Sequence, residues 1–134
     1  MKRILVALDD STRAELVLAA AARLAALSDG KLVLFRAIHV PDEAEPSVEN
    51  DLKRIAYEQL SQLAGTVRAG MVEEIVTDVA RVWDGVVEAG RRHDADLIVI
   101  GCHGYANIDH LSGTIPSKIV NHADRNVLVV RTPL

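Results

Sequence analysis

The stretch Ala95-Asp96-Leu97-Ile98-Val99-Ile100-Gly101 decides the fold of this 134-residue chain. Four consecutive large aliphatic residues, with an acid before them and a glycine after them, are typical of a strand buried on both faces. The segment Ile4-Leu5-Val6-Ala7-Leu8 has the same character, because charged residues border it on both sides. Strands of this kind occur in parallel sheets, whose neighbouring strands are joined through helices.

Three weaker apolar runs predict further strands at residues 32–38, 72–79 and 127–130. Between the five strands, apolar residues recur with helical spacing, which predicts helices at about 12–27, 47–70, 84–93 and 114–122. Thr12 and Glu15 form a capping-box pattern at the start of the first helix, and Ser28-Asp29-Gly30 predicts its end. The alternation predicts an α/β fold, a parallel sheet with helices on both faces, in a single domain covering 1–134.

The composition excludes several classes of protein. Apolar residues make up 49% and charged residues 25% of the chain, which excludes a disordered, collagen-like or disulfide-stapled protein. The core must be aliphatic, because aromatic residues are only 3% of the sequence. They are Phe35, Tyr57, Trp83 and Tyr105.

The charge balance and the termini bear on partners and location. A net charge of −4 argues against a protein that neutralises many nucleic-acid phosphates. The only cysteine, Cys102, permits no intramolecular disulfide, as expected in a reducing compartment. Asp9 and Asp10 end the first apolar run before it reaches the length of a signal sequence, and no run is long enough to cross a membrane. We therefore expect a cytoplasmic protein without nucleic-acid or membrane partners.

The fold class also predicts where a ligand would bind. In such sheets ligands lie beyond the carboxyl ends of the strands, where the strand order changes direction. The loops after Leu8, Ile38, Val79 and Ile100 therefore border the expected crevice. The last of these runs from Gly101 through Gly104 to Gly113-Thr114, directly before a helix.

Glycines ahead of a helix are suited to phosphate binding, because the backbone approaches the anion closely and the first N–H groups of the helix are free. Thr114 is both a candidate N-cap and a candidate donor to phosphate. The spacing matches neither a Walker A motif nor a Rossmann Gly-x-Gly-x-x-Gly. Tight turns and helix capping explain the same glycines equally well, so both interpretations stand.

Several segments, in their order along the chain, resemble the universal stress protein family over essentially its whole length. They are Ile4-Leu5-Val6-Ala7-Leu8-Asp9-Asp10-Ser11, Ala95-Asp96-Leu97-Ile98-Val99-Ile100-Gly101, Gly101-x-x-Gly104 with Gly113-Thr114, and His122-Ala123 ahead of Val127-Leu128-Val129-Val130. The resemblance implies a Rossmann-like, adenine nucleotide alpha hydrolase-like fold with five parallel strands in the order 3-2-1-4-5. It also implies a homodimer through the last strand and, in one branch of the family, ATP binding.

The resemblance further implies a set of nucleotide contacts. They are Ala7, Asp9, Ala37, Gly101, Gly104, Gly113, Thr114 and Ile115. In this set Ala7 and Asp9 lie beside adenine and ribose, and the glycines and Thr114 hold ribose and phosphates, with Ile115 in apolar contact. Ala37 supplies a backbone contact to adenine, although His39-Val40 two residues later resembles the family's usual pair.

Three features depart from the ATP-binding branch. The spacer Tyr105–Ser112 is one residue shorter than usual, and Asp109 stands where basic residues are common. The segment Ala80-Arg81-Val82-Trp83 lacks the Gly-x-Pro often found after the third strand. The hypothesis is a regulatory homodimer that binds ATP, with or without Mg²⁺, and acts on an unknown protein partner.

Two alternatives remain, a dimeric stress-response interaction module that binds no nucleotide and a weak ATP hydrolase. The sequence has neither a P-loop lysine nor an evident general base, so it predicts slow hydrolysis at most.

Other chemically capable side chains have ordinary interpretations. Cys102, His103, Asp109 and His110 are suitable metal ligands, but they lack a familiar ligand spacing, which favours a solvated loop. Trp83 either covers the crevice or begins the third helix and packs on the sheet edge. We expect His122 to pack or to cap the last helix.

Overall fold

The computed structural model describes residues 2–103 and 114–132, in which strands and helices alternate. The elements are β1 (Arg3–Ala7), α1 (Ala14–Ser28), β2 (Lys31–Ile38), α2 (Pro46–Ala64), β3 (Val72–Val79), α3 (Val82–Arg92), β4 (Leu97–His103), α4 (Ile115–His122) and β5 (Asn126–Thr132). All neighbouring strands pair in parallel, in the order β3-β2-β1-β4-β5. The predicted fold class and strand order are confirmed.

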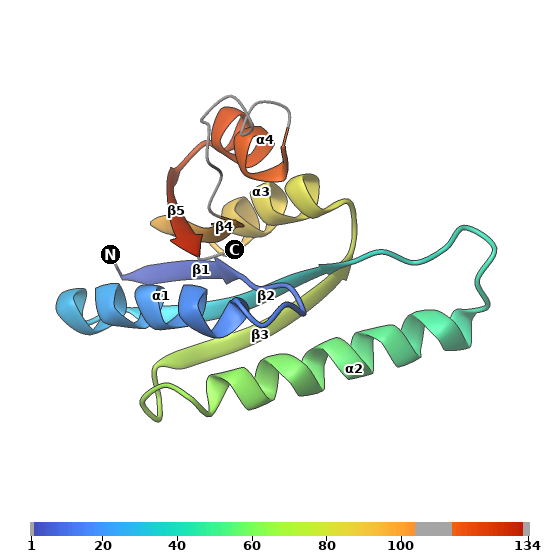
Figure 1. The fold of residues 1–134 in the computed structure, drawn as a ribbon, viewed down its shortest axis with the longest axis horizontal. Coiled ribbons are helices and arrows are strands. Elements are labelled where there is room, and N and C mark those ends of the chain that lie inside the picture. Colours follow the sequence, from blue (N-terminus) through green and yellow to red (C-terminus); the bar gives the residue numbers. More distant parts are fainter. Residues whose placement is uncertain (1, 104–113, 133–134) are drawn as a thin grey trace.

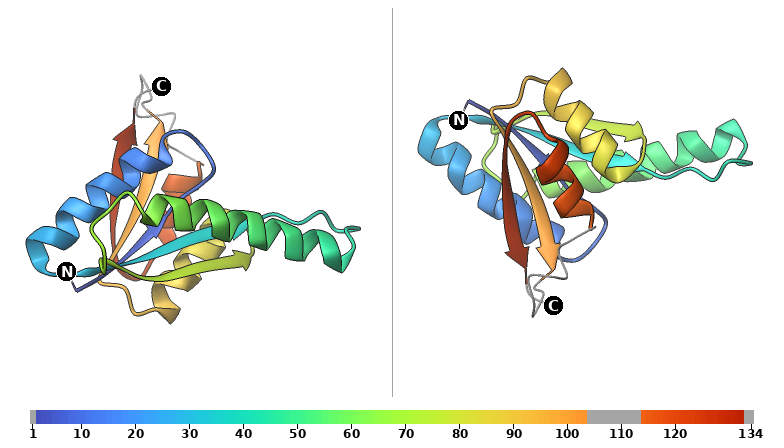
Figure 2. Two further views of the ribbon diagram at one scale, coloured as in Figure 1. Left: turned by 90° about the horizontal axis from the view of Figure 1, so that it is seen from below. Right: turned by 90° about the horizontal axis from the view of Figure 1, so that it is seen from above.

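The helices form a layer on each face of the sheet. Figure 2 shows α1 and α2 over one face and α3 and α4 over the other. Side chains of β1 alternate between the two layers: Ile4 and Val6 belong to the core cluster under α1, and Leu5 belongs to the cluster under α3. All three are 0% exposed, which explains why the strand is apolar throughout rather than alternating with polar residues.

The start of α1 differs from the prediction. A capping box of Thr12 and Glu15 is wrong, because α1 begins at Ala14 with Arg13 as N-cap and without a side-chain cap. The turn before the helix is held by other side chains: Ser11 Oγ accepts from the Arg13 amide at 3.2 Å, and Asp9 Oδ1 accepts from the Ser11 amide at 3.0 Å. Two amides of this turn therefore bond to side chains of the segment between β1 and α1.

The other boundaries shift by a few residues. Asp29 rather than Gly30 takes the left-handed conformation that ends α1, with φ 53°. α2 ends at Ala64, before the expected limit, and β4 continues to His103. Thr114 is the N-cap of α4, as predicted: its side chain accepts from the Ser117 amide at 3.4 Å. The N-terminal part of α2 and the loop before it extend past the end of β3 (Figure 1).

Candidate functional site

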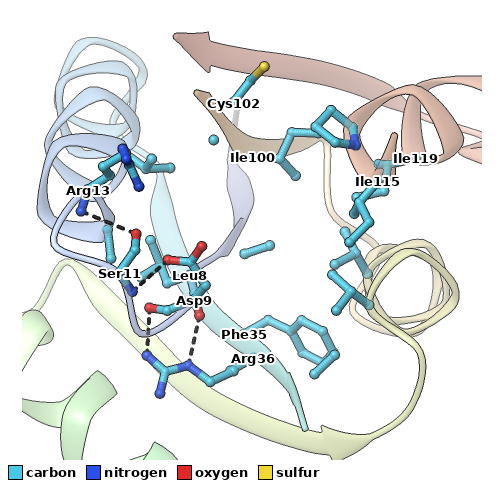
Figure 3. A pocket seen from close by; sticks show the side chains of 18 of the residues that line it. Leu8, Asp9, Ser11, Arg13, Phe35, Arg36, Ile100, Cys102, Ile115 and Ile119 are labelled. Atoms are coloured by element: carbon cyan, nitrogen blue, oxygen red, sulfur yellow. Dashed lines mark hydrogen bonds between the residues drawn. The ribbon is translucent and has the colours of Figure 1, made fainter. Parts of the chain in front are cut away.

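A pocket of about 320 Å³ lies at the carboxyl ends of β1, β2 and β4 (Figure 3). It forms at the ends of the neighbouring strands β1 and β4. The helix that follows β1, α1, lies on one face of the sheet, and the helix that follows β4, α4, lies on the other (Figure 2). This is the crevice that the fold class predicts for a ligand. The volume falls at the lower end of the range of small-molecule sites.

The predicted nucleotide contacts that lie within the described residues meet at this pocket. Ala7, Asp9, Ala37, Gly101, Thr114 and Ile115 all line this pocket. Gly104 and Gly113 lie outside the described residues. Of the two alternatives for the second strand, Ala37 borders the pocket, whereas His39 and Val40 follow the end of β2 and are not among the lining residues.

One wall of the pocket is polar. It includes Asp9, Ser11 and Arg13 from the segment between β1 and α1, together with Arg36 from β2. Asp9 is exposed, and its Oδ1 accepts the Ser11 amide, so the geometry of the turn fixes the position of this carboxylate. Thr114 places the N-terminal end of α4, the positive end of its helix dipole, at the same pocket.

The opposite wall is apolar. Ile100 and Ile119 are buried, and Val82 and Ile115 are 43% and 46% exposed at its rim. Apolar surface on one side and hydrogen-bonding groups on the other suit a ligand with a flat apolar part and a polar edge.

Ala37 offers its backbone to the pocket. The Leu8 N–H donates to the Phe35 carbonyl at 2.9 Å on the β1 side of β2, and the Ala80 N–H donates to the Ile38 carbonyl at 3.2 Å on the β3 side. In a parallel ladder the backbone groups of residues two apart face the same neighbour. The N–H and C=O of Ala37 therefore face the β1 side, beyond the last residue of that strand.

Arg36 was missed by the sequence analysis. Its Nε donates to the Leu8 carbonyl at 2.9 Å, and a terminal nitrogen donates to the Asp9 carbonyl at 2.8 Å. The other terminal nitrogen donates to Gln59 Oε1 on α2. Burial lowers the pKa of Arg36 by more than the nearby charges of Asp10 and Asp9 raise it. The guanidinium nevertheless stays protonated, as arginine does in proteins. The signal in the sequence was a charged residue inside an apolar strand, Phe35-Arg36-Ala37.

Gly101 is constrained by packing as well as by its place at the pocket. A Cβ on this residue would lie 2.7 Å from Val17 Cγ2 on α1, closer than carbon atoms approach in proteins. Glycine at this position therefore lets α1 pack against β4, which is a structural role independent of any ligand.

Trp83 does not line the pocket. It is the second residue of α3 and packs against His122 of α4, with ring centroids 4.6 Å apart. The Arg81 guanidinium lies 5.3 Å from the indole centroid. His122 Nδ1 lies 2.7 Å from the Lys118 carbonyl, in keeping with a packing and capping role. Trp83 therefore packs within the fold, but its ring contact is with α4, not with the sheet edge that the second interpretation named.

Two of the four candidate metal ligands, Cys102 and His103, lie in β4. Asp109 and His110 lie outside the described residues, and Cys102 is buried at 6% exposure. Within residues 2–103 and 114–132, no three His, Cys, Asp or Glu side chains are grouped so that they could hold a metal ion. In the same part of the chain, none of the helices has the length and apolar character needed to cross a membrane.

Comparison with known proteins identifies the family. A model of the universal stress protein family matches residues 1–131. The chain belongs to this family. Universal stress protein A homolog 1 of Coxiella burnetii is 31% identical over 96% of this chain and 95% of the relative. Universal stress protein G of Salmonella typhimurium is 32% identical over 69% of this chain, and the match spans only 58% of that relative.

Solved structures of universal stress proteins share the fold. A universal stress protein in complex with cAMP has a TM-score of 0.77 at 24% identity, covering 96% of each chain. The Archaeoglobus fulgidus universal stress protein in complex with dAMP has a TM-score of 0.70 at 23% identity, covering 97% of this chain and 98% of the other. The match extends over nearly the whole chain in both cases.

Proposed function

We propose that this universal stress protein binds an adenine nucleotide, ATP in particular, in the pocket between β1 and β4. The observation that carries the proposal is that Ala7, Asp9, Ala37, Gly101, Thr114 and Ile115, expected as nucleotide contacts, border one pocket of suitable size. Two structurally similar family members are complexes with cAMP and dAMP, which supports adenine nucleotides as the ligand class.

Adenine fits the part of the pocket beside β2. Its N1 accepts a hydrogen bond and its exocyclic amino group donates one, which complements the N–H and C=O that Ala37 directs past the end of β1. The apolar wall, with Val82 and Ile115 at its rim, would cover the flat base.

The sugar and phosphates would follow along the polar side. The exposed carboxylate of Asp9 is suited to accept from ribose hydroxyls. The phosphates would lie toward Gly101 and Thr114, where the α4 dipole and the threonine hydroxyl favour an anion. Mg²⁺ would accompany ATP as a counter-ion.

In this proposal the protein is a cytoplasmic homodimer, and nucleotide binding regulates its interaction with an unknown protein partner. The dimer is supported by β5, an edge strand that carries Leu128 at 36% exposure beside half-buried valines. An apolar edge strand of this kind favours pairing with another strand. Light scattering during gel filtration should show a dimer for the wild type and a monomer for Leu128→Asp; equal masses would contradict dimerisation through β5.

Calorimetric titration with ATP tests the binding proposal. Asp9→Asn keeps an oxygen to accept the Ser11 amide but removes the charge, so we expect about tenfold weaker binding from the loss of one charged hydrogen bond. Asp10→Asn is the matched control, because Asp10 is the adjacent exposed carboxylate and does not line the pocket. Equal affinities for the two variants, or no binding to the wild type at millimolar ATP, would overturn the proposal.

A further inference from the structure

Arg36 interrupts the hydrogen-bond ladder between β1 and β2 at the pocket. After the bond from the Leu8 N–H to the Phe35 carbonyl, a regular parallel ladder would continue from the Ala37 N–H to the Leu8 carbonyl. That bond is not among the backbone hydrogen bonds of the part of the chain that the structure describes. The Leu8 carbonyl instead accepts from Arg36 Nε at 2.9 Å. An arginine side chain thus replaces the backbone donor.

The guanidinium is anchored on more than one side. It donates to two successive carbonyls, Leu8 and Asp9, and to the Gln59 side chain on α2 (Figure 3 shows the two carbonyl bonds). A planar fork of five donors makes this arrangement, whereas a lysine ammonium is a point charge without that geometry. The bonds hold the turn after β1 in place while leaving the Ala37 N–H directed at the pocket.

We propose that Arg36 determines the base selectivity of the site by occupying the Leu8 carbonyl, so that the Ala37 N–H stays available for N1 of adenine. This inference rests on the proposed function and adds a specificity-determining residue to it. Arg36 acts here through the backbone of its neighbours, as a positioning residue.

Selectivity follows from the direction of the hydrogen bonds. Adenine offers an acceptor at N1 and a donor at its amino group, which pair with the N–H and C=O of Ala37. Hypoxanthine, the base of ITP, offers a donor at N1 and an acceptor at O6. Its N1–H would therefore face the Ala37 N–H, and its O6 would face the Ala37 C=O. Because an unpaired buried polar group is costly, we expect the wild type to prefer ATP over ITP by about 10- to 100-fold.

Removing the guanidinium should let the ladder close by one bond. In Arg36→Met the Leu8 carbonyl loses its partner, and the Ala37 N–H is the donor that a regular ladder would supply. Once that N–H is bonded to Leu8, it no longer distinguishes N1 of adenine from N1–H of hypoxanthine. We therefore expect the ATP to ITP preference of Arg36→Met to fall to within about threefold of unity.

The test measures the affinities of ATP and ITP by calorimetry and the exchange of the Ala37 amide hydrogen by NMR without ligand. Arg23→Met, an exposed arginine of α1 that does not line the pocket, is the control and should retain the wild-type ratio. Both affinities are measured on the same protein, so a general loss of stability does not change their ratio. Arg36→Met should slow exchange of the Ala37 amide.

The possible outcomes separate this inference from the proposed function. An unchanged ratio in Arg36→Met, with ATP still bound by the wild type, overturns the role of Arg36 and leaves nucleotide binding intact. A lost ratio with unchanged exchange at Ala37 overturns the ladder mechanism. If the wild type binds neither nucleotide, both proposals are wrong. If Arg36→Met does not fold, Arg36→Leu and Arg36→Ala replace it, because neither side chain has a donor for the Leu8 carbonyl, and an unchanged ratio in these variants would refute the inference.

Discussion

Replacing Gly101 by alanine should destabilise the folded protein by about 1–3 kcal/mol, the usual cost of overpacking a core. The new Cβ would lie 2.7 Å from Val17 Cγ2, so one of the two elements, α1 or β4, must shift. Val17 is 4% exposed, and a valine in a helix has one strongly preferred side-chain rotamer. Rotation of Val17 therefore does not relieve the clash.

A double-mutant cycle in urea isolates this contact. Val17→Ala alone removes two buried methyl groups and should cost about 1.6 kcal/mol, at roughly 0.8 kcal/mol for each group. In Val17→Ala/Gly101→Ala the smaller side chain makes room for the new Cβ, so the double variant should be less destabilised than the sum by about 1–2 kcal/mol. Additive effects of the two substitutions would refute the reasoning. So would a Gly101→Ala variant whose free energy of unfolding lies within about 0.5 kcal/mol of the wild type, which is about the margin that separates additive from coupled sites.

The same double variant distinguishes the two roles of Gly101. Because Val17 also lines the pocket, the ATP affinity of the double variant is compared by calorimetry with that of Val17→Ala alone, and the difference reports on the methyl group added at Gly101. Weaker binding than in Val17→Ala would indicate that the glycine is required for approach of the ligand, whereas equal binding would indicate that packing against Val17 is its sole role.

Two further predictions concern stability. Thr114→Ala removes the side-chain cap of α4 and should cost about 1 kcal/mol in urea unfolding, whereas Thr114→Ser should stay near the wild type; equal losses would contradict the capping role. The pKa of Asp96 is lowered, first by the backbone N–H of Arg3 and then by that of Lys2, below its ordinary value of 3.8. Its contribution to stability is therefore present above about pH 4 and lost as the pH falls below it. Unfolding of wild type and Asp96→Asn should differ most near neutral pH and converge in acid; a constant difference would contradict this assignment.

The strands were predictable because burial on both faces leaves a simple pattern. Residues such as Leu5 and Val6 point to opposite helix layers, yet both must be apolar, so the run is continuous. Which strands lie side by side is not contained in such runs. The order came from the family resemblance, and it is the pairing of β1 with β4 that brings Asp9 and Gly101 to one pocket.

The missed features depend on contacts between distant residues. Thr12 and Glu15 fit a local capping pattern, but Asp9 and Ser11 compete for the amides of that turn. Arg36 bonds to carbonyls of Leu8 and Asp9, 28 and 27 positions away in sequence, which no local pattern reveals. An arginine within a buried strand indicates that a partner is required, without indicating which one.

The melting temperature of the wild type with and without ATP tests the central claim most directly. A ligand that binds only the folded state at one hundred times its Kd adds about 2.7 kcal/mol of stability. For a chain of this size that corresponds to a rise of roughly 10 °C. We predict such a rise with ATP, reduced in Asp9→Asn and retained in Asp10→Asn. An unchanged melting temperature at millimolar ATP would contradict nucleotide binding at this pocket.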